Sequence, residues 1–262
     1  MAEFFRPECG VPSQELRDAV AIEGLGRTTC ACGYNCVLVE TPAGMAIIDT
    51  GLGARFLGYG PGIEPLVGRL GDRLVTANAP ASELAAVVFT HLHQDHARGA
   101  IWSGNLTFPS AFGFAHAAEI AFWSANAESP SDDPHRAEAI EALRLFGTRM
   151  RPFDYESEIL PGIHTVAAAG HTPGHTAILL ESQGERLLCV GDSFYDPLQV
   201  SHPRWCTPWD NDPARAIVSR ETVLARAADE QLLVHAYHMP FPGLGHVERE
   251  GDTYKWVPAR RE

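Results

Sequence analysis

The feature that most constrains this chain is the segment Thr90–His96, which reads THLHQDH. Its three imidazoles and one carboxylate can face a single point only on a tight loop, because a helix would spread them over several faces. Imidazole mixed with carboxylate is the donor set that proteins use for zinc, and for iron or manganese at catalytic sites. The segment therefore predicts a metal-binding loop. The alternative is a histidine-rich surface loop that binds metal adventitiously.

Further potential ligands each follow a short apolar run that is typical of a strand. His91 follows AVVFT, His171 follows TVAAAG, Asp192 follows LLCVG and His238 follows LLVHAY. Ligand sites of α/β sheets are usually built at the carboxyl ends of strands. We therefore expect these four side chains to share one rim, although they lie far apart in the chain.

The pattern of apolar residues predicts short strands mixed with helices over the whole length. Strands are expected at Cys36–Glu40, Met45–Ile48, Ala86–Thr90, Ile163–Ala168, Ala177–Glu181, Leu187–Val190 and Leu232–Ala236. Helices are expected at Ala115–Trp123, Arg136–Phe146 and Pro213–Ala228, the last with Asp212 as its N-cap. The glycine-rich stretch Ala54–Ala79 is expected to be loop with a short helix. This mixture favours a layered α/β fold, and without repeats or linkers we expect one domain over residues 1–262.

The net charge of −13 restricts the partners of the chain. A field of that sign repels phosphate backbones and anionic membranes, so we expect a small-molecule substrate and no nucleic acid or membrane. No stretch approaches the roughly 20 apolar residues of a membrane span. The N-terminus lacks the apolar core of a signal peptide, so the expected location is the cytoplasm.

Six cysteines raise the alternative of a thiolate site. Cys30, Cys32 and Cys36 could contribute to one, but no second cluster completes four ligands at zinc-finger spacing. Cys36 and Cys189 lie in apolar runs, where a thiol behaves as a small hydrophobic side chain. We expect structural thiols.

Taken together, these motifs resemble those of the metallo-β-lactamase superfamily, over roughly residues 35–256. Five motifs occur in order: Asp49 in IIDTG, the HxHxDH loop, His171 in GHTPGH, Asp192 in VGD, and His238. The resemblance implies a four-layer αββα sandwich with the active site at one edge.

The resemblance also implies a dinuclear site. One metal would bind His91, His93 and His171, the other would bind Asp95, His96 and His238, and Asp192 would bridge both. Zn²⁺ is the expected ion, with Mn²⁺ or Fe as alternatives. Two divalent ions carry +4, which Asp95, Asp192 and a bridging hydroxide reduce to about +1, matched to an oxyanion formed in hydrolysis.

Other motif residues allow two interpretations each. Asp49 either orients a ligand imidazole or caps a turn, and His175 either steers the metal loop or makes a structural hydrogen bond. Tyr195 either contacts a substrate oxygen, as in the acyl-homoserine-lactone lactonases that the chain resembles, or packs beside the rim. The candidate catalytic residues are Asp95, Asp192 and Tyr195. One or two aromatic side chains are expected to contact substrate, out of Trp102, Phe112, Phe114, Phe122, Trp123, Phe194, Trp205, Trp209 and Phe241.

Within the family, the features favour the lactonase and organophosphate-hydrolase branch. Asp192 as a bridging acid argues against a true β-lactamase, and the acidic charge argues against ribonuclease-type members. Segments around Gln199–Trp205 and after His238 resemble relatives of methyl parathion hydrolase. Tyr195 favours a lactone or carboxylic ester as substrate, with a phosphotriester as the alternative.

Three other functions remain open on the sequence alone. They are a glyoxalase II-like thioester hydrolase, a mononuclear iron persulfide dioxygenase and a non-catalytic metal-binding protein. Thioester hydrolases of the glyoxalase II type normally carry a helical C-terminal domain, whereas only about 24 residues follow His238. Because relatives are often dimers, the resemblance also implies a homodimer.

Overall fold

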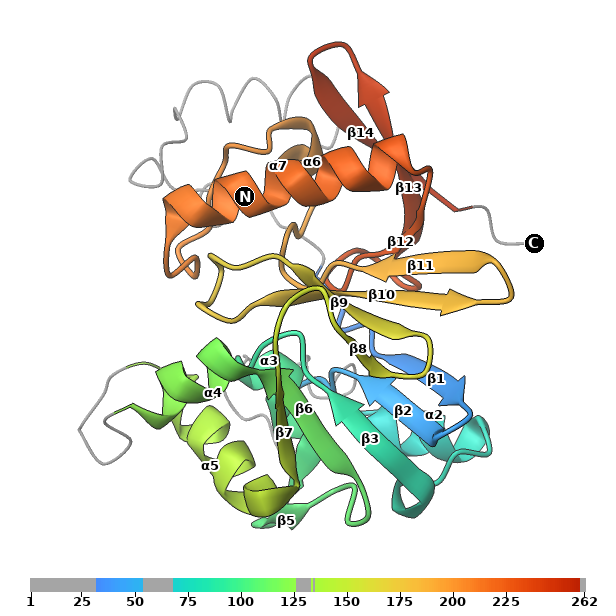
Figure 1. Ribbon diagram of the computed structural model, residues 1–262, viewed down its shortest axis with the longest axis vertical. Coiled ribbons are helices and arrows are strands. Elements are labelled where there is room, and N and C mark those ends of the chain that lie inside the picture. The colour runs from blue at the N-terminus through green and yellow to red at the C-terminus, as the bar shows by residue number, and fades with distance from the viewer. Residues whose placement is uncertain (1–31, 54–67, 126–132, 134, 260–262) are drawn as a thin grey trace. The chain divides into compact units, whose positions relative to one another are not determined.

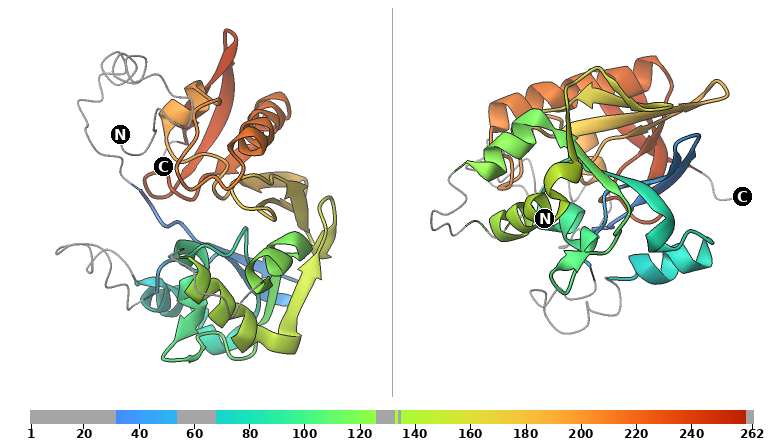
Figure 2. Two further views of the ribbon diagram at one scale, coloured as in Figure 1. Left: turned by 90° about the vertical axis from the view of Figure 1, so that its left-hand side faces the viewer. Right: turned by 60° about the horizontal axis from the view of Figure 1, so that its bottom comes forward.

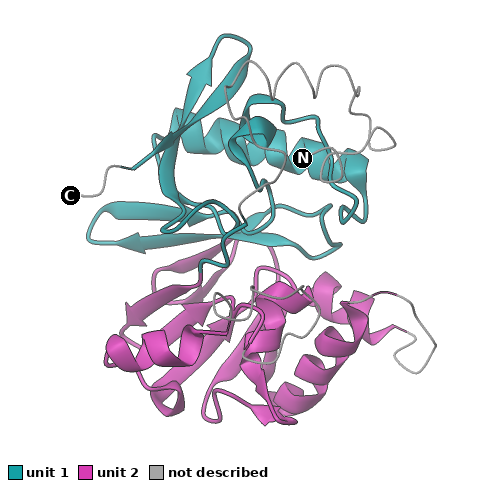
Figure 3. Ribbon diagram, turned by 180° about the vertical axis from the view of Figure 1, so that it is seen from behind, with its two compact units in different colours: residues 1–35, 166–262 teal, residues 36–165 magenta. Residues whose placement is uncertain are grey.

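The computed structural model describes residues 32–53, 68–125, 133 and 135–259. The chain divides into two compact units, coloured separately in Figure 3: unit 2 is Cys36–Thr165, and unit 1 combines Met1–Asn35 with Val166–Glu262. Each unit has its own cluster of buried apolar side chains. The expectation of one domain over residues 1–262 stays a prediction. Among the described residues, no helix has the length and apolar character to span a membrane.

Unit 2 is built on a five-stranded sheet of order β1-β2-β3-β6-β7 (Figure 1). The strands are β1 (Val37–Thr41), β2 (Gly44–Ile48), β3 (Leu84–Val88), β6 (Phe112–His116) and β7 (Met150–Phe153). Only the β1–β2 pair is antiparallel, whereas the pairs β2–β3, β3–β6 and β6–β7 are parallel. The segments that follow β2 and β3 therefore begin at the same edge of the sheet.

The helices of unit 2 bury apolar side chains in the same cluster as the sheet. They are α2 (Leu70–Thr76), α3 (Gln94–Ala97), α4 (Ala117–Ser124) and α5 (Arg136–Phe146), with 3-10 turns at Ala81–Glu83, Arg98–Ala100 and Gly147–Arg149. Figure 2 shows α4 and α5 side by side, as their contacts require. A small hairpin joins β4 (Ile101–Trp102) to β5 (Asn105–Leu106), and β8 (Glu158–Leu160) pairs antiparallel with β9 (Ile163–Ala167).

In unit 1 the strands run in the order β14-β13-β12-β11-β10. They are β10 (Thr176–Ser182), β11 (Glu185–Cys189), β12 (Leu233–His235), β13 (Leu244–Glu250) and β14 (Thr253–Pro258). Only β11 and β12 are parallel, so the segments that follow these two strands leave the sheet at one edge. The helices are α6 (Pro197–Ser201) and α7 (Pro213–Asp229).

Helix α7 illustrates how the sequence sets the packing of unit 1. The Asp212 carboxylate accepts a hydrogen bond from the Arg215 amide at 3.1 Å, and Pro213 occupies the first turn, as the sequence predicts. Its apolar side packs Val223 and Leu224 into the core, and α7 lies beside β13 (Figure 2). Burial of one such side chain stabilises the fold by about 1.5–3 kcal/mol.

The predicted strands and helices are confirmed, although several of their boundaries differ. All seven predicted strands are present with ends shifted by a few residues, and the helices Arg136–Phe146 and α7 are found. The helix expected from Ala115 begins at Ala117, because Ala115 and His116 continue β6 and pair with β7. In the stretch Ala54–Ala79 the short helix is α2, and residues 54–67 lie outside the described residues, as do Cys9 and Cys30.

Candidate metal centre

In unit 2, Asp49 fixes the start of the histidine loop. It follows β2 directly, and its backbone amide donates to Val88 of the neighbouring β3. One carboxylate oxygen accepts the Thr90 amide at 2.9 Å, and the other accepts the Thr90 hydroxyl at 2.8 Å. That second oxygen also accepts Nδ1 of His96 at 2.8 Å. Asp49 therefore orients the imidazole of His96, whose role as a metal ligand stays a prediction.

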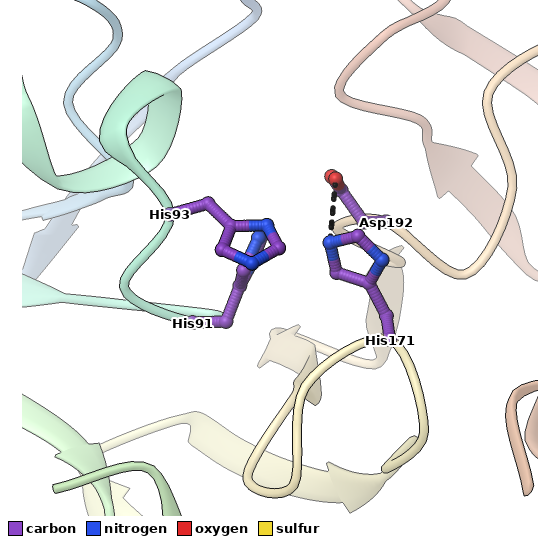
Figure 4. Close-up of side chains that lie close together, drawn as sticks. All are labelled: His91, His93, His171 and Asp192. Atoms are coloured by element: carbon purple, nitrogen blue, oxygen red, sulfur yellow. Dashed lines mark ion pairs between the residues drawn. The ribbon is translucent and has the colours of Figure 1, made fainter. Parts of the chain in front are cut away.

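Four candidate ligands gather on this loop within unit 2. The rings of His91 and His96 have centroids 4.1 Å apart, and those of His91 and His93 lie 4.6 Å apart. His91 and His93 leave the loop next to each other (Figure 4), with ligand atoms within 4.8 Å. Nε2 of His96 lies 3.9 Å from the Asp95 carboxylate. The loop thus presents a nitrogen-rich donor group with one carboxylate.

Glu119 supports this loop from α4, a role that sequence reasoning missed. Its side chain is fully buried, and Oε1 accepts the Leu92 amide at 2.9 Å and Nε1 of Trp123 at 2.6 Å. The Trp123 ring meets His93 edge-on, with centroids 5.8 Å apart. The available signal was one acid in the otherwise apolar segment AAEIAFW, placed four residues before a tryptophan.

His135 supports the other end of the loop. Its ring stacks on His93 with centroids 4.0 Å apart and planes inclined by 25°. Its Nδ1 accepts the Gln94 amide at 3.3 Å, so it satisfies a donor in the first turn of α3. Helix α3 carries Asp95 and His96.

In unit 1, Asp192 lies between two imidazoles. It follows β11, and His238 follows the parallel strand β12, which brings both to one edge of the sheet. One Asp192 oxygen lies 3.2 Å from Nε2 of His171 (Figure 4), and the other lies 3.3 Å from Nε2 of His238. A carboxylate with an imidazole at each oxygen is suited to bridge two metal ions.

The turn before His171 is closely packed against α7. Gly170 has φ of 135°, and a Cβ atom there would come within 2.2 Å of the Ala216 backbone nitrogen. The amides of Asn211 and Asp212 donate to the carbonyls of His171 and Gly170 at 2.9 and 2.8 Å. A residue with a side chain at position 170 would push His171 away from the helix.

His175 joins the His171 turn to Asp192. Its Nδ1 donates to the Ala168 carbonyl at 2.8 Å, and its Nε2 accepts the Asp192 amide at 2.9 Å. These partners fix the tautomer with the proton on Nδ1. The interpretation of His175 as a structural hydrogen-bonding residue is confirmed.

Four of the predicted ligand histidines share one hydrogen-bonding pattern. In each, Nδ1 contacts an oxygen at 2.8–3.1 Å, so that Nε2 is the nitrogen available to a metal. The pairs are His91 with Thr90, His96 with Asp49, His171 with Asp210, and His238 with the Gly33 carbonyl. Metal-binding histidines almost always donate their other N–H in this way, so the donor set fits divalent metal ions.

Two carboxylates give the His171 position a strong preference for positive charge. Burial by itself lowers the pKa of the His171 imidazole, but the charge and hydrogen bond of Asp192, followed by those of Asp210, raise it to about 9. Burial raises the pKa of Asp210, but the hydrogen bond from His171 and the charge of Arg220 outweigh it and lower that pKa. A metal ion would satisfy the same preference.

Tyr195 lies in contact with three of these residues. Its hydroxyl donates to Asp192 at 2.7 Å and lies 3.2 Å from Nδ1 of His171. Its ring stacks on that of His238, with centroids 4.8 Å apart and planes inclined by 14°. The Trp209 ring lies 6.3 Å away and is 42% exposed.

Most of the aromatic side chains proposed to meet substrate lie in the cores or are only partly exposed. Phe194 and Trp123 belong to the buried clusters of unit 1 and unit 2, and Trp205 is buried. The clearly exposed ones in unit 1 are Trp209 and Phe241, the latter 75% exposed. Trp102 and Phe112 of unit 2 are exposed as well, and which of these rings contacts substrate stays a prediction.

The profile of the metallo-beta-lactamase superfamily matches residues 31–238, most of the chain. The chain belongs to the metallo-β-lactamase superfamily. An N-acyl homoserine lactonase from a Bacillus species is 26% identical over 173 residues, 61% of this chain and 63% of that protein. An N-acyl homoserine lactonase from Bacillus cereus is 26% identical over 168 residues, which cover 59% of this chain and 61% of that protein. This metallo-β-lactamase family member spans about three fifths of the length of these curated relatives.

Solved structures establish the same fold. AidC, a dizinc quorum-quenching lactonase in complex with the product N-hexanoyl-L-homoserine, has a TM-score of 0.85 at 24% identity, covering 98% of this chain and 89% of that one. The hydrolase AbOPH of the beta lactamase superfamily gives a TM-score of 0.83 at 24% identity, with 96% and 88% covered. The chain has the metallo-β-lactamase fold, and one sheet with its helices in each unit is consistent with the predicted α/β sandwich.

Proposed function

We propose that this chain is a metal-dependent hydrolase that binds two divalent ions. His91, His93 and His171 would hold one ion, Asp95, His96 and His238 the other, and Asp192 would bridge them. The observation that carries the proposal is the set of Nδ1 hydrogen bonds, which aims Nε2 of four imidazoles at metal ions.

The chemistry of the site supports hydrolysis. Two divalent ions held by these residues would supply an activated water and would polarise a carbonyl or phosphoryl oxygen. Tyr195 would donate its hydroxyl to the substrate oxygen on which negative charge develops. Asp192 would accept a proton and then pass it to the leaving oxygen. Asp95, Asp192 and Tyr195 are therefore the proposed catalytic residues.

We propose a lactone or carboxylic ester as the substrate. The relatives similar to this chain are named as lactonases, and those from Bacillus as N-acyl homoserine lactonases. In this chain, the Tyr195 hydroxyl lies against Asp192 and can donate a hydrogen bond. The exposed rings of Trp209 and Phe241 suit an acyl chain. In the segment that resembles organophosphate hydrolases, Gln199 accepts the Tyr195 amide and donates to the Trp205 carbonyl, and a phosphotriester is the alternative substrate.

Zn²⁺ is the proposed metal, because imidazole and carboxylate suit it and AidC is a dizinc enzyme. A small molecule is the proposed partner, in keeping with the net charge of −13. The cytoplasmic location and the homodimer stay predictions.

The test is a rate assay on zinc- and manganese-loaded protein with three substrates: a long-chain acyl lactone, an aryl phosphotriester and an acyl thioester. His93→Ala serves as the blank, and His164→Ala, outside the ligand groups, is its matched control. Lactone turnover that is lost only in His93→Ala supports the proposal. Preference for the phosphotriester or the thioester would reassign the substrate. One iron per chain with oxygen uptake on a persulfide would instead indicate a dioxygenase, and bound metal without any turnover a non-catalytic protein.

A further inference from the structure

Arg220 is a charged side chain in the interior of unit 1. It lies on the buried side of α7 and is only 1% exposed. Its Nε donates to the Ser193 carbonyl at 2.6 Å, and one terminal nitrogen donates to the carbonyls of Pro203 and Trp205 at 2.8 and 3.0 Å. The other terminal nitrogen lies 3.5 Å from the Asp210 carboxylate. A buried guanidinium is costly unless it is paired in this way, so its partners indicate its role.

Two of these partners lead directly to proposed metal ligands. Ser193 is the residue after Asp192. Oδ1 of Asp210 accepts Nδ1 of His171 at 3.1 Å, while Oδ2 faces Arg220. One side chain therefore fixes both the backbone beside the bridging carboxylate and the residue that orients an imidazole.

A third link reaches Tyr195 through Gln199. Oε1 of Gln199 accepts the Tyr195 amide at 3.1 Å, and its Nε2 donates to the Trp205 carbonyl at 2.9 Å. Arg220 donates to that same carbonyl. The segments that carry Asp192, Tyr195 and Asp210 thus converge on one guanidinium.

We propose that Arg220 is a positioning residue, which holds Asp210 against His171 and thereby sets the metal affinity of the proposed site. The inference rests on the ligand set of the proposed function. The planar fork of arginine can bind three carbonyls and a carboxylate in fixed directions, which the point charge of lysine cannot reproduce. Partners of ligand histidines typically change metal affinity by about 10- to 100-fold when they are replaced.

The experiment compares Arg220→Met and Arg220→Lys with Arg226→Met. Arg226 lies on the same helix and also forms an ion pair, with Glu230 at 2.9 Å, but none of the contacts described above. Zinc retention is measured by competition with a chelator, at a temperature well below the lowest unfolding midpoint of the variants. The visible spectrum of the Co²⁺-loaded proteins reports ligand geometry, which a loss of global stability alone does not alter.

We expect zinc retention to fall by about 10- to 100-fold in Arg220→Met, by less in Arg220→Lys, and by under about 2-fold in Arg226→Met. The Co²⁺ spectrum should change only in the Arg220 variants. In an Asp210→Asn background, Arg220→Met should add little further loss, because the path through Asp210 is already broken.

Unchanged zinc retention and Co²⁺ spectrum in Arg220→Lys and Arg220→Met would overturn the inference. Full additivity of Arg220→Met with Asp210→Asn would overturn it as well, because Arg220 would then act by another path. If Arg220→Met does not fold, Arg220→Lys alone and combined with Asp210→Asn gives the same comparison. Failure of the proposed function is a separate result: wild-type protein that binds zinc but hydrolyses nothing leaves these metal measurements readable.

Discussion

The hydroxyl of Tyr195 donates a 2.7 Å hydrogen bond to the carboxylate of Asp192, while its ring stacks on His238. A phenol that only filled space at the rim would have no need of a buried carboxylate as its partner. In the proposed enzyme, with metal ions bound to Asp192, the same hydroxyl would donate to a substrate oxygen. This relationship gives the first prediction.

Tyr195→Phe should lower the kcat for a lactone by about 10- to 1,000-fold, because a hydrogen bond to the developing oxyanion is lost. Zinc content should stay unchanged, since the phenol is not a proposed ligand. Steady-state kinetics together with metal analysis measures both, and Tyr254→Phe on β14 is the matched control. An unchanged kcat would assign Tyr195 a packing role only.

The sequence was sufficient to predict candidate ligands, which stay predictions, but not the residues that orient them. His171, Asp192 and His238 could be predicted because each follows a recognisable apolar run and has metal-binding chemistry. Their supports could not, because the contact of Asp210 with His171 joins residues 39 positions apart. No local pattern marks that pair.

The same limit applies to strands that the sequence analysis does not predict, of which β13 and β7 are examples. β13 carries several exposed charged residues, and its place in the sheet comes from pairing with β12 and β14. β7 reads MRPF, and its pairing with β6 outweighs the low strand propensity of Pro152. Tertiary neighbours, which the local pattern does not contain, determine both elements.

Glu119→Gln should destabilise the protein by about 1–3 kcal/mol, because hydrogen bonds from Leu92 and Trp123 to a buried carboxylate become weaker or unmade. Urea unfolding measures the change. Glu141→Gln on α5, where the side chain is 40% exposed and lies 3.9 Å from Arg144, should change stability by under about 0.5 kcal/mol. Equal effects of the two substitutions would contradict a special role for Glu119.

His235 should make stability depend on pH. Burial lowers the pKa of its imidazole from 6.5 to about 4. As the pH falls, the unfolded chain therefore binds a proton on His235 before the folded chain does. The contribution of neutral His235 to the free energy of unfolding is complete above about pH 6.5 and is lost as the pH falls towards 4. The slope is at most about 1.4 kcal/mol per pH unit.

His235→Leu removes this proton site. The unfolding free energy of wild type minus that of the variant should fall by about 2–3 kcal/mol between pH 7 and pH 4. Urea unfolding at several pH values measures it, and the two curves should run parallel above pH 7. Curves that stay parallel down to pH 4 would mean that His235 is not held neutral by the fold.

Trp209 should determine how the proposed enzyme responds to acyl-chain length. Its ring is 42% exposed and lies 6.3 Å from that of Tyr195, so an acyl chain on a substrate held by Tyr195 would cover it. Loss of about 1.4 kcal/mol of apolar contact corresponds to a tenfold change in binding. Trp209→Ala should therefore raise KM about tenfold for a long-chain lactone and little for a short-chain one, with kcat nearly constant.

Trp102→Ala, which removes a tryptophan 49% exposed on the β4–β5 hairpin, is the matched control. An equal rise in KM for both chain lengths would show that Trp209 does not contact the chain.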